Sequence, residues 1–164
     1  MAFDRVKKYF ENVGLGDRVK ELENSSATVE LAAKAIGCEP KQIAKTMSFF
    51  IEEQPVLIVT AGDAKIDNKK YKQTFDKKAK MIPWDQVEER IGHSPGGVCP
   101  FAVKTDVEVY LDVSLRRFDY VYPAGGSGNS AVKVTLEELI EYSESKGWID
   151  VCKDWTAKGE VEAC

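Results

Sequence analysis

The spacing of apolar residues changes several times along the chain, from helical to strand-like and back. Near the N-terminus, Phe3, Val6 and Phe10 recur every three or four positions, as on one face of an amphipathic helix. The segments 45–51 (KTMSFFI) and 55–60 (PVLIVT) are strongly apolar and are joined by a polar EEQ connection, which predicts a β-hairpin. The second segment shows no alternation, which is typical of a strand covered on both faces.

Helix start and stop signals delimit the other elements. Thr28 is a typical N-cap, Gly37 is a typical helix end, and Thr135 forms a capping box with Glu138. In the helix expected before Gly92, we expect Trp84 to face inward. The expected helices cover residues 4–12, 29–36, 68–75, 83–91 and 135–146, and the expected strands cover 18–23, 45–51, 55–60, 80–82, 107–112, 119–122 and 131–134.

Helices and strands are interspersed, and neither repeats nor a linker divide the chain. This organisation predicts an α/β (mixed α+β) fold: a single domain over residues 1–155, with a central mixed, largely antiparallel sheet flanked by helices. A chain of 164 residues is long enough to bury roughly 70% of its unfolded surface. Residues 156–164 carry no core signal, and we expect a loose C-terminal tail there.

Composition narrows the class of protein. The chain is 43% hydrophobic and 30% charged, and it has neither the apolar run of a signal peptide nor a membrane-spanning segment. We therefore expect a cytoplasmic protein without membrane contacts. The four cysteines show no CxxC spacing and there is one histidine, so we expect reduced thiols, no metal and no cofactor.

Charge is distributed unevenly. The net charge of −4 argues against indiscriminate coating of nucleic acid. Between Lys65 and Lys80, however, there are seven lysines against two aspartates. The simpler interpretation of this run is a solvated helix, and the functional one is local contact with a phosphate backbone.

The candidate chemistry lies at Lys45 and in the loop Gly92–Phe101 (GHSPGGVCPF). Strand alternation places Lys45 in phase with Met47 and Phe49, so its amine is expected to point inward. An inward lysine is costly unless anionic or carbonyl groups meet it. The alternative, nearly as good, is that Lys45 opens the strand and reaches water. The glycines and prolines of the loop predict a fixed turn whose backbone N–H groups can approach a ligand.

Two motif matches fail on their context. GHSPG (92–96) fits the G-x-S-x-G nucleophile elbow, but a helix precedes it and no histidine follows His93, so a serine triad is rejected. GSGNSA (126–131) fits the dinucleotide fingerprint, but a strand follows instead of a helix, and we interpret it as a hairpin turn. Cys99 is a candidate nucleophile, but a small semi-buried filler before Pro100 is the favoured interpretation, and His93 is interpreted as a loop residue.

An ordered set of short motifs resembles the YbaK-type aminoacyl-tRNA deacylases, which are related to the editing domain inserted in bacterial prolyl-tRNA synthetase. The motifs are LAA after Thr28, then IAKT (43–46), AGD (61–63), GGVCPF (96–101), LDVSL (111–115) and AGG (124–126). The resemblance runs from about Ser25 to Val151. It implies hydrolysis of the ester between a wrong amino acid and the terminal adenosine of a tRNA, often the tRNA for proline.

The same resemblance implies roles for individual residues. Lys45 corresponds to the key pocket lysine of the family, which orients the substrate and stabilises charge, while the ribose hydroxyl of the substrate replaces a histidine base. A partnership with prolyl-tRNA synthetase is also implied. The expected substrate-binding residues are Thr46, Gly62, Asp63, Gly96, Gly97, Val98, Cys99, Pro100, Gly125, Gly126 and Ser127, and the expected tRNA-binding residues are Lys65, Lys69, Lys70 and Lys72.

The substrate and the activity stay open at this point. Alanine-specific relatives tend to carry asparagine after the lysine and a late histidine, whereas here Thr46 follows and no late histidine exists. Cysteine, alanine or another small residue on tRNA is therefore considered. The leading hypothesis is a free-standing trans-editing hydrolase. The alternatives are a non-catalytic module that binds aminoacyl-tRNA or a synthetase, and a hydrolase of small esters or amides.

Overall fold

The structure is a computed structural model that describes residues 2–25 and 28–155. The expected tail at 156–164 lies outside the described residues. The α-helices are α1 (Ala2–Glu11), α2 (Val29–Ile36), α3 (Asn68–Phe75), α4 (Val87–Ile91) and α5 (Leu136–Ser143). The strands are β1 (Val19–Glu21), β2 (Ile43–Ile51), β3 (Gln54–Ala61), β4 (Lys65–Ile66), β5 (Glu108–Asp112), β6 (Tyr120–Pro123), β7 (Ser130–Val132), β8 (Val134–Thr135), β9 (Trp148–Ile149) and β10 (Cys152–Lys153).

A six-stranded mixed sheet in the order β8-β6-β2-β3-β5-β9 forms the centre of the fold. Strands β2 and β3 form the expected antiparallel hairpin, in which Lys45 lies opposite Thr60. Strand β6 joins β2 in parallel, and β5 joins β3 in parallel. Two further pairs, β1–β7 and β10–β4, are antiparallel. Within the six-stranded sheet, two of the five pairings are antiparallel and three are parallel. The expected mixed sheet with flanking helices is therefore confirmed, but the expectation that this sheet is largely antiparallel is wrong, because β5, β6 and β9 each join a neighbour in parallel.

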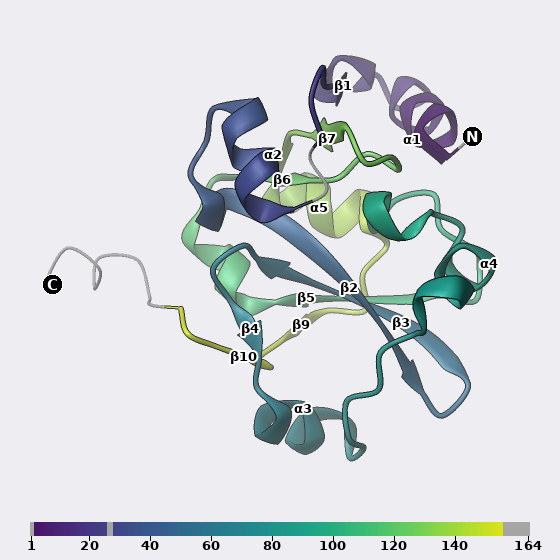
Figure 1. Cartoon of the computed structure of the whole chain (residues 1–164), viewed down its shortest axis with the longest axis vertical. Helices are drawn as coiled ribbons and strands as arrows, with labels where there is room; N and C mark the ends of the chain where they lie inside the picture. Colours follow the sequence, from purple (N-terminus) through teal and green to yellow (C-terminus); the bar gives the residue numbers. More distant parts are fainter. Residues whose placement is uncertain (1, 26–27, 156–164) are drawn as a thin grey trace, which may run out of the picture.

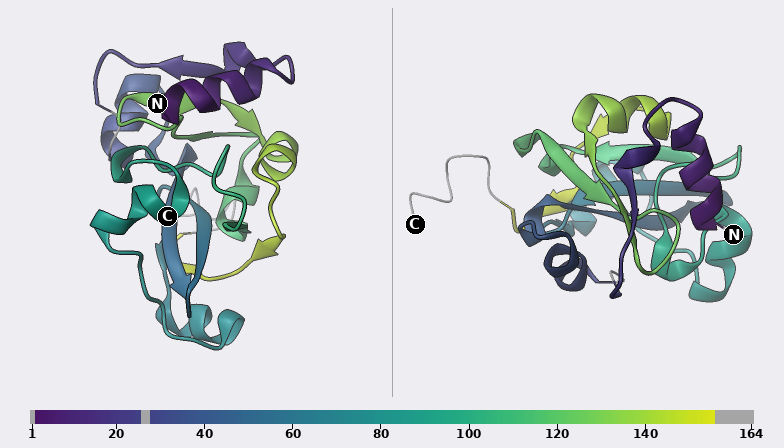
Figure 2. Two further views of the ribbon diagram at one scale, coloured as in Figure 1. Left: turned by 90° about the vertical axis from the view of Figure 1, so that its right-hand side faces the viewer. Right: turned by 90° about the horizontal axis from the view of Figure 1, so that it is seen from above.

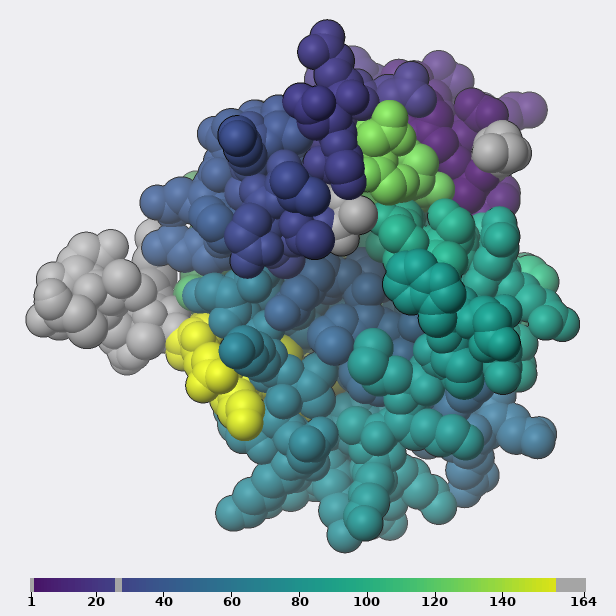
Figure 3. Space-filling model, viewed as in Figure 1, coloured from purple at the N-terminus to yellow at the C-terminus, as the bar shows by residue number. Residues whose placement is uncertain are grey.

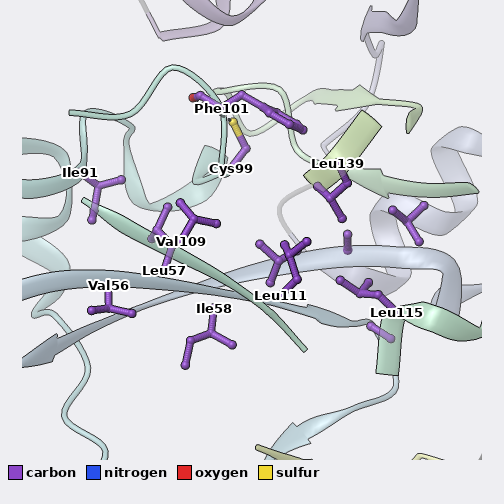
Figure 4. Close-up of a cluster of buried hydrophobic side chains, with 14 of the residues drawn as sticks. Val56, Leu57, Ile58, Ile91, Cys99, Phe101, Val109, Leu111, Leu115 and Leu139 are labelled. Atoms are coloured by element: carbon purple, nitrogen blue, oxygen red, sulfur yellow. Dashed lines mark hydrogen bonds between the residues drawn. The ribbon is translucent and has the colours of Figure 1, made fainter. Parts of the chain in front are cut away.

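The hydrophobic core lies against β3 and β5. Every residue of β3 after Gln54 is buried, as the unbroken apolar run predicted. Figure 4 shows Leu57 and Ile58 of β3 beside Val109 and Leu111 of β5, with Cys99 and Phe101 in the same cluster. The sheet is thereby fixed on both faces, and its ends are available to carry loops.

Short polar signals determine where the helices begin and end. The side chain of Thr28 caps α2, that of Asp67 caps α3, and Thr135 forms the predicted capping box with Glu138 at α5. Figure 1 and the left view of Figure 2 show α1 and α2 at one end of the molecule and α3 at the opposite end. The lysine-rich helix α3 packs against β2 through Tyr71, whose ring centroid lies 5.2 Å from that of Phe49.

Three local predictions are wrong. Trp84 does not face inward: a short 3-10 helix (Trp84–Gln86) precedes α4, Ile82 and Val87 fill the core, and the indole stays 76% exposed. The stretch 80–82 forms an isolated bridge from Met81 to Phe49 instead of a strand. The glycine-rich segment after β6 does not close a hairpin, because β7 pairs with β1 and β6 pairs with β8.

Candidate functional site

A small cavity of about 120 Å³ opens beside the start of β2. One wall comes from α2, with Val29 and Ala32, and a second from Lys45 and Thr46 of β2. The 3-10 helix η4 (Pro95–Gly97) and the chain that follows β6 close the remaining sides. The volume is below the roughly 300–1,000 Å³ of ordinary ligand sites. The cavity therefore suits a small group.

Lys45 is half-buried and lines this cavity. Burial lowers the pKa of its amine from the ordinary 10.5, because desolvation disfavours the charged form. The nearby groups of Cys152, Asp63 and Glu30 oppose this shift in pKa, whereas the charge of Lys65 adds to it. Strand β2 begins at Ile43, so Lys45 is not the first strand residue, and the alternative in which it opens the strand is excluded.

Thr46, the residue after Lys45, also lines this cavity. Its Oγ1 atom is buried and has no hydrogen-bond partner among residues 2–25 and 28–155. A buried hydroxyl without a partner costs about 1–3 kcal/mol. The position therefore favours a ligand that donates to or accepts from this oxygen.

The loop Gly92–Phe101 divides its residues between the cavity and the core. Gly96 and Val98 line the cavity. Gly97 is buried, its N–H donates to the Ser94 carbonyl at 2.9 Å, and a Cβ atom at this position would overlap the Ser127 backbone. Cys99 is buried behind the loop, and Pro100 lines a different hollow of the surface. The predicted set of donors is thus reduced to the cavity residues Gly96 and Val98.

A second glycine-rich segment, residues 124–131, packs against the loop Gly92–Phe101 at Gly97. The hydroxyl of Ser130 accepts hydrogen bonds from the N–H groups of Gly125, at 3.0 Å, and Ser127, at 3.2 Å. These two amides are therefore committed within the segment. Gly126 has a φ of 95°, and a Cβ atom there would press on the backbone of α1. Among these residues, Ser130 lines the cavity and was not predicted.

Gly62 and Asp63 lie beside the cavity without lining it. A Cβ atom at Gly62 would overlap the Pro40 carbonyl, which explains the glycine there. Asp63 forms two hydrogen bonds with the guanidinium of Arg117, at 2.9 and 2.5 Å. Arg117 is buried and was not predicted, since its distance from Asp63 in sequence gives no local signal. Substrate contacts by Gly62 and Asp63 stay predictions.

The predicted tRNA-binding lysines are on β4 and α3. Lys65, Lys69 and Lys72 are exposed. Lys70 instead contacts Asp150 at 3.1 Å and the Cys152 carbonyl at 3.0 Å. Lys65 is close enough to Lys45 for its charge to lower the pKa of that amine, and Cys152 is a neighbour of both Lys45 and Lys70. The strand β4 and the start of α3 are therefore on the side of the hairpin that carries Lys45.

Cys99 and His93 are brought together, which the sequence did not show. The Sγ of Cys99 lies 3.6 Å from Nε2 of His93. Both side chains are fully buried, and burial raises the pKa of the thiol to about 12 and lowers that of the imidazole. Figure 4 shows Cys99 among apolar side chains. Cys99 is therefore a small filler, as predicted, but it is fully buried instead of semi-buried, and this environment opposes a nucleophilic role.

Within the described parts of the chain, no cluster of three or more His, Cys, Asp or Glu side chains is arranged to hold a metal ion. No helix formed by those residues is long and apolar enough to cross a membrane.

Comparison with known proteins identifies the class to which this fold and cavity belong. The family model described as the aminoacyl-tRNA editing domain matches residues 23–142. The chain therefore belongs to the aminoacyl-tRNA editing domain family, and the predicted YbaK-type resemblance is confirmed.

Individual relatives agree with this assignment. YwhH of Bacillus subtilis (strain 168) is 55% identical over 156 residues, which cover 94% of this chain and 99% of YwhH. Proline--tRNA ligase of Bacillus velezensis is 26% identical over 71% of this chain, and the match spans 23% of the ligase. EbsC of Enterococcus faecalis, named "Putative Cys-tRNA(Pro)/Cys-tRNA(Cys) deacylase", is 23% identical, with 73% of this chain and 74% of EbsC covered.

A solved structure extends the likeness to three dimensions. The crystal structure of "a putative trans-editing enzyme for prolyl tRNA synthetase" superimposes with a TM-score of 0.83 at 29% identity, covering 93% of this chain and 97% of that one. The fold of this chain is therefore that of the editing domains.

Proposed function

We propose that the protein is a free-standing hydrolase that removes a small wrong amino acid, such as cysteine or alanine, from a tRNA for proline. The observation that carries the proposal is the half-buried Lys45 in the same small cavity as Gly96 and Val98. The family and the names of its relatives support the substrate class. We place the protein in the cytoplasm, where aminoacyl-tRNA is used. Prolyl-tRNA synthetase would be the source of the mischarged substrate.

The proposed reaction is attack of water on the ester carbonyl carbon. The C–O bond to the ribose breaks, the proton of the water passes to the ribose oxygen, and the amino acid leaves as the acid. Negative charge develops on the carbonyl oxygen in the transition state, and an ammonium group with backbone donors stabilises it. We assign this role to Lys45 together with the amides of Gly96 and Val98.

The cavity offers no side chain as a general base. Its described lining contains neither a carboxylate nor an imidazole. We therefore assign the orientation of the attacking water to the vicinal ribose hydroxyl of the substrate, as the family resemblance implies. An ester is already activated, so positioning the water supplies much of the acceleration.

The test is release of amino acid from the tRNA for proline charged with cysteine, alanine or proline. We expect hydrolysis of at least one mischarged form and little of the prolyl form. Lys45→Ala should reduce the rate by about 10²–10³-fold, the usual effect of removing one oxyanion donor. Lys34→Ala, an exposed lysine on α2, is the matched control and should retain the wild-type rate.

Two outcomes would contradict the proposal. Wild-type turnover by a folded Lys45→Ala protein would remove Lys45 from the mechanism. Tight binding of charged tRNA without release of any amino acid would instead support a non-catalytic module.

A further inference from the structure

A second hollow, of about 240 Å³, continues from the candidate cavity over the outer side of β2. The two spaces share Thr46, Pro95 and Val98 as common walls. The far side of the second hollow is formed by Met81 and Trp84. We call this second space the Trp84 groove. A group bound in the cavity can therefore extend into the groove past Thr46.

The groove exposes two large apolar side chains. Met81 is 55% exposed and Trp84 is 76% exposed. A single exposed apolar residue is ordinary, but two that flank a groove next to a ligand cavity mark an interaction surface. In Figure 3 the segment that carries them lies on the same face as α2, which forms a wall of the cavity.

The backbone holds this pair firmly in place. The Phe50 N–H donates to the Lys80 carbonyl at 2.8 Å, and the Ile82 N–H donates to the Ser48 carbonyl at 3.1 Å. Ile82 and Val87, on either side of Trp84, are both 4% exposed and anchor the segment in the core. The indole is thus presented by a fixed support, which lowers the entropic cost of binding a planar ligand.

The charges around the groove favour a neutral ring over a phosphate. Asp85, Glu88 and Glu89 are exposed just beyond Trp84, and they repel anions. Lys80 is exposed beside Met81 on the other side. Aromatic side chains stack on nucleobases of any identity, and each such stack is a substantial contribution to binding.

We propose that the Trp84 groove binds the terminal adenosine of the RNA, with the base stacked on the indole of Trp84 and the ribose beside Thr46. This inference rests on the proposed function, because the amino acid in the cavity is esterified to the ribose of that nucleotide. Thr46 lines both spaces, and its Oγ1 is buried without a partner among the described residues. Rotation of this side chain toward the ligand would let a ribose hydroxyl satisfy that oxygen. Trp84 and Thr46 are binding residues in this proposal, and neither takes part in bond breaking.

The experiment measures binding without hydrolysis. Uncharged RNA hairpins with the proline acceptor stem are prepared with a CCA end and with a CC end that lacks the terminal adenosine. Wild-type protein should bind the CCA hairpin roughly tenfold more tightly, the usual effect of one stacked base. Trp84→Ala should bring this ratio close to one, and Trp84→Phe should keep most of it. Ile140→Ala, another exposed apolar residue, on α5, should leave the ratio unchanged.

The outcomes separate this inference from the proposed function. An equal preference for CCA in wild type and in Trp84→Ala would overturn the inference, even if mischarged tRNA is hydrolysed. A Trp84-dependent preference in a protein that hydrolyses nothing would support the groove and contradict the hydrolase. Binding of adenosine monophosphate at Trp84 by a protein that binds neither hairpin would also overturn the RNA assignment.

Discussion

The candidate cavity and the pocket around Cys99 lie on two sides of one loop, and burial has opposite consequences in them. At Lys45, desolvation lowers the pKa of an amine that still lines an open cavity. At Cys99, desolvation raises the pKa of the thiol to about 12 in a position with no exposed surface. The first group is accessible and can change its charge, whereas the second is enclosed and stays neutral.

This difference shows that proximity between reactive groups is a poor sign of function. Cys99 and His93 lie 3.6 Å apart, a spacing compatible with a nucleophile and a base, but the same Nε2 of His93 donates to the Phe101 carbonyl at 2.8 Å and so cannot accept a proton from the thiol. Moreover, burial lowers the pKa of His93, so an imidazolium that would stabilise a thiolate is disfavoured. Lys45 has the thiol of Cys152 and the carboxylates of Asp63 and Glu30 as neighbours rather than an imidazole, and its cavity gives it access to a substrate. Access and charge together therefore identify the site.

The largest effect that bears on this contrast is expected from the charge of Lys45. Its pKa lies below 10.5, so hydrolysis should fall about tenfold per pH unit once the pH exceeds the lowered value. Lys45→Met should be slower by about 10²–10³-fold near neutral pH and should lack this alkaline decline. Single-turnover rates between about pH 7 and pH 10, corrected for spontaneous hydrolysis, measure both effects.

The lowered pKa of Lys45 should also change how the free energy of unfolding depends on pH. Between the lowered pKa and 10.5, the folded protein binds fewer protons at Lys45 than the unfolded chain does. Wild-type stability should therefore rise with pH in that window relative to Lys45→Met. A wild-type rate profile without any alkaline decline would contradict the assigned role of the ammonium.

A smaller effect is expected at the loop that joins the two regions. A Cβ atom at Gly97 would overlap the backbone of Gly126 and Ser127, so Gly97→Ala must push the two glycine-rich segments apart. We expect a loss of about 1–3 kcal/mol in the free energy of unfolding, together with slower hydrolysis. The matched control is Gly96→Ala, whose Cβ would come no closer than 4.0 Å to the Gly128 Cα. Equal destabilisation of the two variants in urea unfolding would contradict this packing.

Local sequence signals were sufficient for most elements and for the centre of the site. The caps at Thr28 and Thr135 and the β2–β3 hairpin follow from local patterns along the chain, and strand alternation indicated an inward Lys45 against an almost equal alternative. The pocket shared by Lys45 and the glycine-rich loop was suggested by the chemistry of the two segments and by the family resemblance, since spacing along the chain does not place β2 beside η4. The structure confirms that Lys45 and Gly96 line one cavity.

Long-range packing accounts for what the sequence did not reveal. Trp84 looked like a core residue because it lies among apolar neighbours, but Ile82 and Val87 fill that space. Ser130 accepts a hydrogen bond within a glycine-rich turn, and Arg117 donates to Asp63, which is distant in the chain. No periodic pattern in the sequence marks either residue. The contact of His93 with Cys99 depends on how the loop folds back, which composition does not determine.

The smallest effect is expected at Cys99, the enclosed group of the two that are compared. Cys99→Ala removes a buried sulfur atom and should lower the free energy of unfolding by about 1 kcal/mol, as for one buried methylene group. Because the thiol has neither access nor a low pKa, the hydrolysis rate should change less than about twofold. In the native protein, an alkylating reagent near neutral pH should modify the partly exposed Cys38 well before Cys99, as peptide mapping would show. Rapid native alkylation of Cys99, or loss of hydrolysis in Cys99→Ala at unchanged stability, would mean that the pocket opens and that the contrast with Lys45 is wrong.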